Sequence, residues 1–154
     1  MTPELTLGSA DDVRALVGES PRMSKWVEID QASVDRFAVA TGDHQWIHVD
    51  PERAKRESPF GGPIAHGFLT LSLIPALLIE TFRFEQRMGV NYGLNRVRFT
   101  APVPVGSQLR ASFGVASVTD VEAGGVQIAW NVTLERQGSE GPVCVAEFIT
   151  RHYF

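Results

Sequence analysis

The chain has 154 residues and a single cysteine, Cys144, so it cannot form an internal disulfide. It also has no excess of basic residues, because 14 lysines and arginines stand against 18 acidic residues and the net charge is −4. A nucleic-acid-binding domain usually carries a strongly basic surface, so nucleic acid is not an expected partner. Two short basic clusters, at residues 53–56 and 96–98, are interpreted as solvated surface or as contacts for a phosphorylated ligand.

The sequence contains no apolar run long enough to cross a membrane. Its longest apolar stretch, residues 63–79, is interrupted by polar side chains and by Pro75. A membrane-spanning helix needs about 20 mostly apolar residues, so a core helix without membrane insertion is predicted. Charged residues such as Glu4 and Arg14 interrupt the first part of the chain, which therefore does not resemble a secretory signal. A cytoplasmic location is the expectation.

Several common catalytic signatures are missing. The chain has no Gly-x-Ser-x-Gly nucleophile elbow, and Gly61-Gly62 is not followed by the Gly-Lys-Ser/Thr of a phosphate-binding loop. His44 and His48 are four residues apart, a spacing that can suit a metal ion. No His-Glu-x-x-His pattern, cysteine pair or evident third ligand accompanies them, so no metal site is predicted.

The length suits a single domain over residues 1–154. In its first half, a short helix is expected near residues 11–17 and a strand at residues 25–29. Asp30 is a suitable N-cap for a helix that ends at Gly42, because glycine tolerates the left-handed conformation at a helix C-terminus. Asp50-Pro51 begins a further helix, with proline at its first position.

The second half predicts a helix enclosed by a sheet. The segment 63–79 leaves no polar face, so its helix should be surrounded by protein, with a bend or break at Pro75. After residue 88 the pattern is that of strands, and it is clearest at residues 126–134, where apolar residues alternate with other residues. Pro102 and Pro104 suit an edge or bulge position. These elements predict an α+β fold in which a curved antiparallel sheet wraps around a central hydrophobic helix.

The residues that carry chemistry lie in the segment 41–51, which is interpreted as a loop between two helices. A loop can bring the carboxylate of Asp43 and the imidazole of His48 to one point, although they are five residues apart. A water held there could lose a proton to one group while the other manages the second proton. Gly67 follows His66 at the start of the buried helix, where free backbone amides can stabilise an oxyanion.

The segment from Thr41 resembles the signature of the MaoC-like, or R-specific enoyl-CoA hydratase, family. Gly42, Asp43, Ile47 and His48 match the motif. Gln45-Trp46 replaces its usual asparagine-proline pair, a variation that resembles the nodulation-protein-N-like branch and bears on pocket shape and chain-length preference. The segments 64–69 and 97–103 are also similar to the family, and the resemblance covers about residues 20–152.

The resemblance implies a hot-dog fold and a hydratase that interconverts trans-2-enoyl and (R)-3-hydroxyacyl thioesters. Asp43 and His48 would be the catalytic pair, and the Gly67 amide would bind the thioester oxygen. The substrate would be an acyl-CoA or an acyl-carrier thioester, so no cofactor beyond the coenzyme A of the substrate is expected. The family also implies a homodimer, which would pair the exposed sheet edges.

Two other functions remain open from the sequence. Hot-dog domains also hydrolyse thioesters, and a fold does not determine its reaction; the chain could also be a non-catalytic module that binds acyl thioesters. The spacing of Asp43 and His48 argues against the first, and the presence of both argues against the second. Taken alone, Asp43 could be a turn residue and His48 a structural histidine. Asp50 is interpreted as an N-cap, His66 as an anchor of the helix start, and Ser72 and Cys144 as packing residues.

Overall fold

The computed structural model describes residues 5–154. The predicted domain over residues 1–154 and the amino-terminal segment with Glu4 both extend into residues 1–4, which lie outside the described residues. In chain order the elements are β1 (Leu5–Leu7), α1 (Ala10–Arg14), β2 (Arg22–Met23), β3 (Val27–Ile29), α2 (Gln31–Thr41), α3 (Trp46–Val49), α4 (Pro51–Glu57), α5 (Gly67–Ser72), α6 (Ile74–Thr81), β4 (Phe82–Phe84), β5 (Met88–Phe99), β6 (Ser107–Val121), the short 3-10 helix η1 (Glu122–Gly124), β7 (Gly125–Arg136) and β8 (Pro142–Tyr153).

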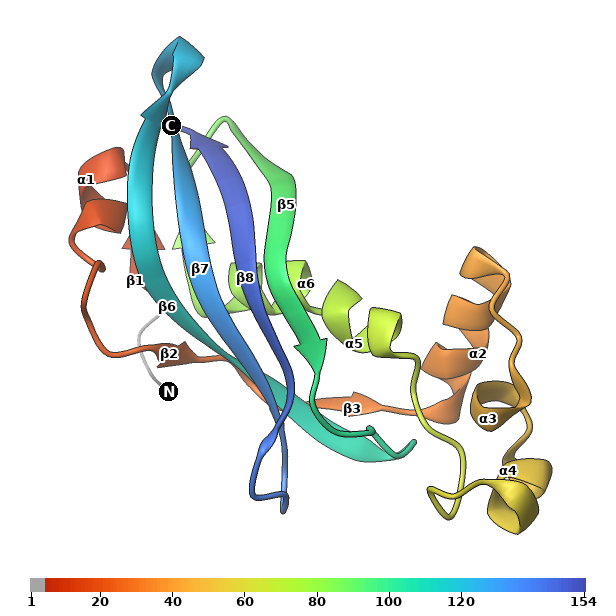
Figure 1. Ribbon diagram of the computed structural model, residues 1–154. Helices are drawn as coiled ribbons and strands as arrows, with labels where there is room; N and C mark the ends of the chain where they lie inside the picture. The colour runs from red at the N-terminus through yellow and green to blue at the C-terminus, as the bar shows by residue number, and fades with distance from the viewer. Residues whose placement is uncertain (1–4) are drawn as a thin grey trace.

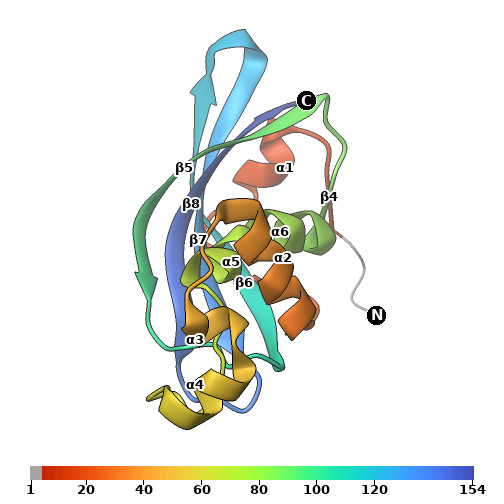
Figure 2. The same cartoon turned by 90° about the vertical axis from the view of Figure 1, so that its right-hand side faces the viewer.

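The main sheet has the strand order β2-β6-β7-β8-β5, with β3 also pairing with β6, and all of its pairs are antiparallel. The four long strands curve together (Figure 1). Seen from the side, the helices gather on one face of the sheet, with α5 and α6 closest to it (Figure 2). The predicted α+β architecture, a curved antiparallel sheet around a central helical segment, is confirmed.

Alternation along β6, β7 and β8 places one side-chain row in the core. In β7 the residues Val126, Ile128, Trp130, Val132 and Leu134 are all buried, as the alternating pattern predicts. Trp130 is the largest of the fully buried side chains, and the Phe82 and Phe113 rings pack against it. Burying such aromatic rings supplies much of the hydrophobic stabilisation of a small domain.

The helix starts follow the capping rules that the sequence indicates. The Asp30 side chain accepts a hydrogen bond from the Ser33 amide at 2.8 Å, and α2 ends at Gly42, which has a φ of 82°. The Asp50 side chain likewise accepts from the Arg53 amide at 3.1 Å and begins α4. The interpretation of residues 41–51 as one loop is wrong in part, because a helical turn, α3, forms inside it.

The central helix is divided, and it is not enclosed on all sides. The break lies at Leu73, which ends α5 and precedes α6, so the interruption expected from Pro75 is confirmed. Phe68 and Ile79, however, are 68% and 63% exposed in the single chain. The expectation that protein surrounds this segment is therefore wrong for the monomer, because the sheet covers only one side of the helices. None of the helices within residues 5–154 is long and apolar enough to span a membrane.

Two features of the fold differ from what the sequence predicts: an additional strand pair and the placement of two prolines. β1 pairs in parallel with β4, joining the amino-terminal segment to the chain just after α6. Each of these strands has three residues, too few to produce a periodic pattern. The bulge position expected for Pro102 and Pro104 is wrong, because both lie in the connection between β5 and β6, whereas the irregular registers of β5 fall between Asn91 and Gly93 and between Asn95 and Arg98. Pro104 forms an isolated bridge with Ile64 in this connection.

Strand β5 forms an edge of the sheet and exposes apolar side chains. Val90, Tyr92 and Leu94 are each more than 40% exposed, and β8 is the only strand within residues 5–154 that pairs with β5. A hollow of about 420 Å³ lies between this edge and the α5–α6 segment. An unpaired apolar edge is an aggregation hazard unless another chain covers it.

We therefore expect a two-fold homodimer in which the β5 edges face each other. Light scattering at micromolar concentration should give an even multiple of 16.9 kDa. Replacing Val90 and Leu94 by lysine should shift the mass toward one chain, because charge at an edge opposes strand pairing. The paired control is lysine at Val39, which is exposed on α2 away from β5. A wild-type mass of one chain would contradict the dimer.

Candidate active site

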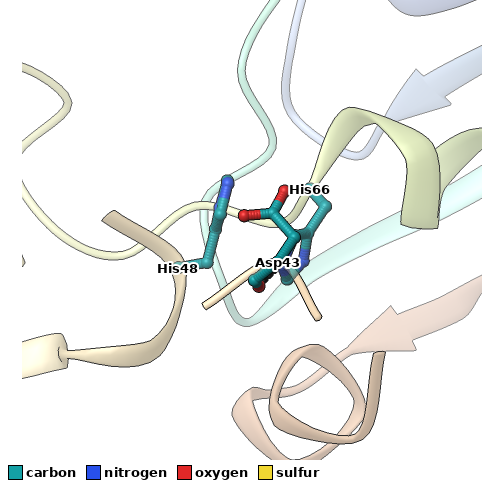
Figure 3. A group of neighbouring side chains, drawn as sticks. All are labelled: Asp43, His48 and His66. Atoms are coloured by element: carbon teal, nitrogen blue, oxygen red, sulfur yellow. Dashed lines mark hydrogen bonds between the residues drawn. The ribbon is translucent and has the colours of Figure 1, made fainter. Parts of the chain in front are cut away.

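Three polar side chains from separate elements converge beside the start of α5. Asp43 follows the glycine that ends α2, His48 lies on α3, and His66 is the N-cap residue of α5. A carboxylate oxygen of Asp43 and one ring nitrogen from each histidine lie within 4.8 Å of one another. Figure 3 shows the Asp43 carboxylate next to the two rings. The pairing of Asp43 with His48 is thus present, and His66 is an additional member.

His48 is held in one tautomer by the backbone. It is 7% exposed, and its Nδ1–H donates to the Ile64 carbonyl at 2.7 Å. Because a carbonyl only accepts, Nδ1 carries the proton and Nε2 is unprotonated in the neutral ring. Burial also lowers the pKa of His48 below its ordinary value, against the opposing effect of the bond to Ile64. The ring therefore offers a free basic nitrogen at neutral pH.

Asp43 is positioned through its backbone, while its carboxylate is exposed. The Asp43 carbonyl accepts a hydrogen bond from His66 Nε2–H at 3.0 Å, which ties the loop to the start of α5. The carboxylate accepts from the Gln45 amide at 3.3 Å, just before α3 begins. The side chain is thus oriented beside His48 without being buried.

The contacts of His66 within this site were not predicted from the sequence. Its ring stacks on His48 with centroids 3.9 Å apart and contacts Phe37. An anchoring role was predicted for it, and the bond to Asp43 is such an anchor. Its Nδ1 is buried without a hydrogen-bond partner in the described part of the chain. Asp43, His48 and His66 are also the three residues that could bring ligand atoms to a metal ion, so the expectation of no metal stays a prediction.

An apolar cavity of about 350 Å³ opens next to His48 and Gly67. Most of its wall is hydrophobic, from Phe60, Ile64, Ala65, Phe99, Ala101, Pro102, Val103 and Val143. Gly67 is the first residue of α5, and the first amide that bonds within this turn is that of Leu69, to the His66 carbonyl. The Gly67 amide thus lies in the first turn of the helix, where backbone N–H groups have no acceptor within the helix.

A side chain at position 67 would meet a neighbour that the sequence did not indicate. An added Cβ would lie 3.0 Å from the Phe99 ring, which is closer than ordinary contact. The expectation was that a side chain would crowd a bound oxygen directly. That expectation stays a prediction, and the structure adds Phe99, itself part of the cavity wall, as a group that the side chain would displace.

The other residues singled out in the sequence lie outside this cluster. His44 is exposed, and Asp50 caps α4 as expected. Ser72 Oγ donates to the Phe68 carbonyl. Cys144 is fully buried, and burial raises the pKa of its thiol to about 11, so it is an unreactive core residue. Of the basic residues, Arg53 is paired with Glu57 at 2.8 Å and lies over the Trp46 ring.

Comparison with known proteins identifies the family. A family model described as a MaoC like domain matches residues 12–136. The chain belongs to the MaoC-like family. It is 51% identical to the 3-hydroxyacyl-thioester dehydratase Z of Mycobacterium tuberculosis, over 96% of this chain and 97% of that protein. It is 48% identical to nodulation protein N of Rhizobium meliloti, over 92% and 89% of the two chains. The family and the nodulation-protein-N-like resemblance are both confirmed.

Solved structures of MaoC-like proteins share the fold. The R-hydratase PhaJ1 from Pseudomonas aeruginosa superposes with a TM-score of 0.70, at 24% identity over 88% of this chain and 82% of that one. At this level of identity the likeness concerns the fold alone. It confirms the hot-dog architecture that the sequence predicts for this MaoC-like chain.

Proposed function

We propose that this MaoC-like protein interconverts trans-2-enoyl thioesters and (R)-3-hydroxyacyl thioesters by adding or removing water. Membership of the family supports hydratase or dehydratase chemistry on such thioesters, as does 51% sequence identity to a relative named as a 3-hydroxyacyl-thioester dehydratase. The (R) configuration, the coenzyme A carrier and the roles of individual residues are the finer part of the proposal. They rest on the matching motif around Asp43 and His48.

One observation carries the proposal. The unprotonated Nε2 of neutral His48 belongs to a side chain that lines an apolar cavity, beside a carboxylate and the Gly67 amide. In the proposed reaction, a water bound between Asp43 and His48 adds its oxygen to C3 of the enoyl group. The pair takes a proton from the water and supplies a proton to C2, so that H and OH are added across the double bond.

The Gly67 amide would stabilise the negative charge that develops on the thioester oxygen during this addition. The apolar wall formed by residues such as Phe60 and Phe99 would hold the acyl chain. The proposed steps use no metal, redox group or separate cofactor. Coenzyme A enters the reaction as part of the substrate. Such a reaction involves neither nucleic acid nor membrane insertion.

Incubation with crotonyl-CoA, in the presence of a chelator, tests the proposal. Loss of the conjugated enoyl absorbance without release of thiol, together with formation of (R)-3-hydroxybutyryl-CoA, is the expected result. Free thiol would indicate a thioesterase instead. Binding of crotonyl-CoA without change in either signal would indicate a non-catalytic module, and activity that the chelator abolishes would indicate a metal.

The pH dependence follows from the surroundings of His48. Burial holds the pKa of His48 below its ordinary value of 6.5, so the basic form persists at mildly acidic pH. As the pH falls, kcat/KM should decline only when this ring becomes protonated, with an acidic midpoint below 6.5 in the free enzyme. A midpoint above 6.5 that is assigned to His48 by NMR titration of the ring would contradict the proposed base.

A further inference from the structure

Thr70 is a buried polar residue that the proposed reaction does not yet use. Thr70 is 2% exposed, and its hydroxyl has no hydrogen-bond partner within residues 5–154. It lines the same cavity as His48 and Gly67. Leaving a buried hydroxyl unpaired is unfavourable, and such groups in native proteins usually serve a purpose.

Other helical hydroxyls of this chain are paired. Thr41, Ser72 and Thr81 each donate to the carbonyl four residues earlier, at 2.7, 2.6 and 2.7 Å. For Thr70 the corresponding acceptor is the carbonyl of His66, which already accepts from the amides of Leu69 and Thr70 at 3.0 and 3.2 Å. The Thr70 hydroxyl is therefore left without an acceptor among the described residues.

The position of Thr70 on α5 indicates which group that is. Gly67 and Thr70 are three residues apart, so they share one face of the helix, and helical side chains lean toward the N-terminus. The Thr70 side chain is therefore expected to lean toward the turn whose first amide is that of Gly67. The other threonine of the cavity wall, Thr100, already donates its hydroxyl to the Pro142 carbonyl. Of the two threonines in the cavity wall, Thr70 is therefore the one whose hydroxyl proton has no acceptor in the described chain.

We propose that the Thr70 hydroxyl donates a second hydrogen bond to the thioester carbonyl oxygen, beside the bond from the Gly67 amide. This inference rests on the proposed function, and it makes the oxyanion site a pair formed by one backbone amide and one side chain. The carbonyl oxygen gains negative charge in the transition state, so the bond strengthens as the reaction proceeds. Thr70 thereby favours substrates with a carbonyl oxygen next to the sulfur.

The first test compares Thr70→Val with Thr70→Ser. Valine preserves the shape and removes the hydroxyl, so kcat/KM for crotonyl-CoA should fall about 10–100-fold, somewhat less than for loss of a main oxyanion donor. The Tm should stay the same or rise, since an unpaired buried hydroxyl is replaced by a methyl group. Serine keeps the hydroxyl and should retain most of the rate. Thr81→Val is the control, because its hydroxyl is bonded within α6.

The second test measures binding and does not depend on turnover. Calorimetry compares butyryl-CoA with S-butyl-CoA, a thioether that lacks the carbonyl oxygen. The wild type and Thr70→Ser should prefer the thioester, and Thr70→Val should lose part of that preference, because the Gly67 amide still donates to the carbonyl oxygen.

Undiminished kcat/KM in Thr70→Val, or an unchanged thioester preference, would overturn the role of Thr70. A wild type that prefers the thioester but does not hydrate crotonyl-CoA would leave the carbonyl site supported while refuting the proposed function. A wild type with no preference for the thioester would refute the carbonyl site itself.

Discussion

Asp43→Asn and His48→Gln should each lower kcat for crotonyl-CoA hydration by about 10²–10⁴-fold, the usual contribution of a general acid or base. Asparagine keeps the size of the Asp43 side chain and its bond to the Gln45 amide while removing the charge. Glutamine at position 48 removes the imidazole ring and with it the basic Nε2. Because both groups act on the same water, the double variant should be little slower than either single variant.

The two substitutions differ in their expected effect on stability. The Asp43 side chain is exposed and should leave the Tm close to the wild-type value, whereas His48 is buried and stacked on His66. A modest fall in Tm is therefore expected for His48→Gln alone. His44→Gln, at an exposed neighbouring position, is the matched control and should have wild-type kinetics. Normal turnover in a folded Asp43 or His48 variant would rule out the assigned pair.

Gly67→Val should reduce kcat by about 10²–10³-fold, which is the typical cost of losing an oxyanion donor. The new side chain would push against Phe99, whose ring lies 3.0 Å from the position of an added Cβ. Phe99 is 46% exposed and can move, so activity should suffer more than stability. Moving the ring would change both the cavity wall and the approach to the Gly67 amide.

A glycine a few residues earlier supplies the control for this prediction. An alanine at Gly62 would meet no atom within 4 Å, and this position does not need a positive φ. Gly62→Ala should therefore retain the wild-type rate, while Gly67→Ala should already show part of the loss seen with valine. If Gly67→Val hydrates crotonyl-CoA normally, the thioester oxygen binds elsewhere.

The features that could be predicted from the sequence are those determined by local chemistry. Asp30 and Gly42 mark the ends of α2 because capping and left-handed φ depend on one or two residues. The alternation in β7 likewise follows from the two-residue period of a strand. Asp43, His48 and Gly67 could be selected because they belong to compact motifs.

The features that escaped prediction depend on contacts between distant segments. The bond from His66 to the Asp43 carbonyl spans 23 residues, and no local pattern indicates it. The unpaired hydroxyl of Thr70 becomes apparent only when the His66 carbonyl is seen to be occupied by two amides. The exposure of Phe68 was missed because an apolar pattern cannot tell whether the covering surface belongs to the same chain or to another one.

Hydration of crotonyl-CoA in D₂O tests the central claim most directly. If the site adds water across the double bond, mass spectrometry should show 3-hydroxybutyryl-CoA with a single solvent deuterium on C2, and chiral analysis should show the (R) configuration at C3. Asp43→Asn and His48→Gln should both suppress this product. Crotonate and free coenzyme A as the products, or undiminished formation of the deuterated product in either variant, would contradict the account.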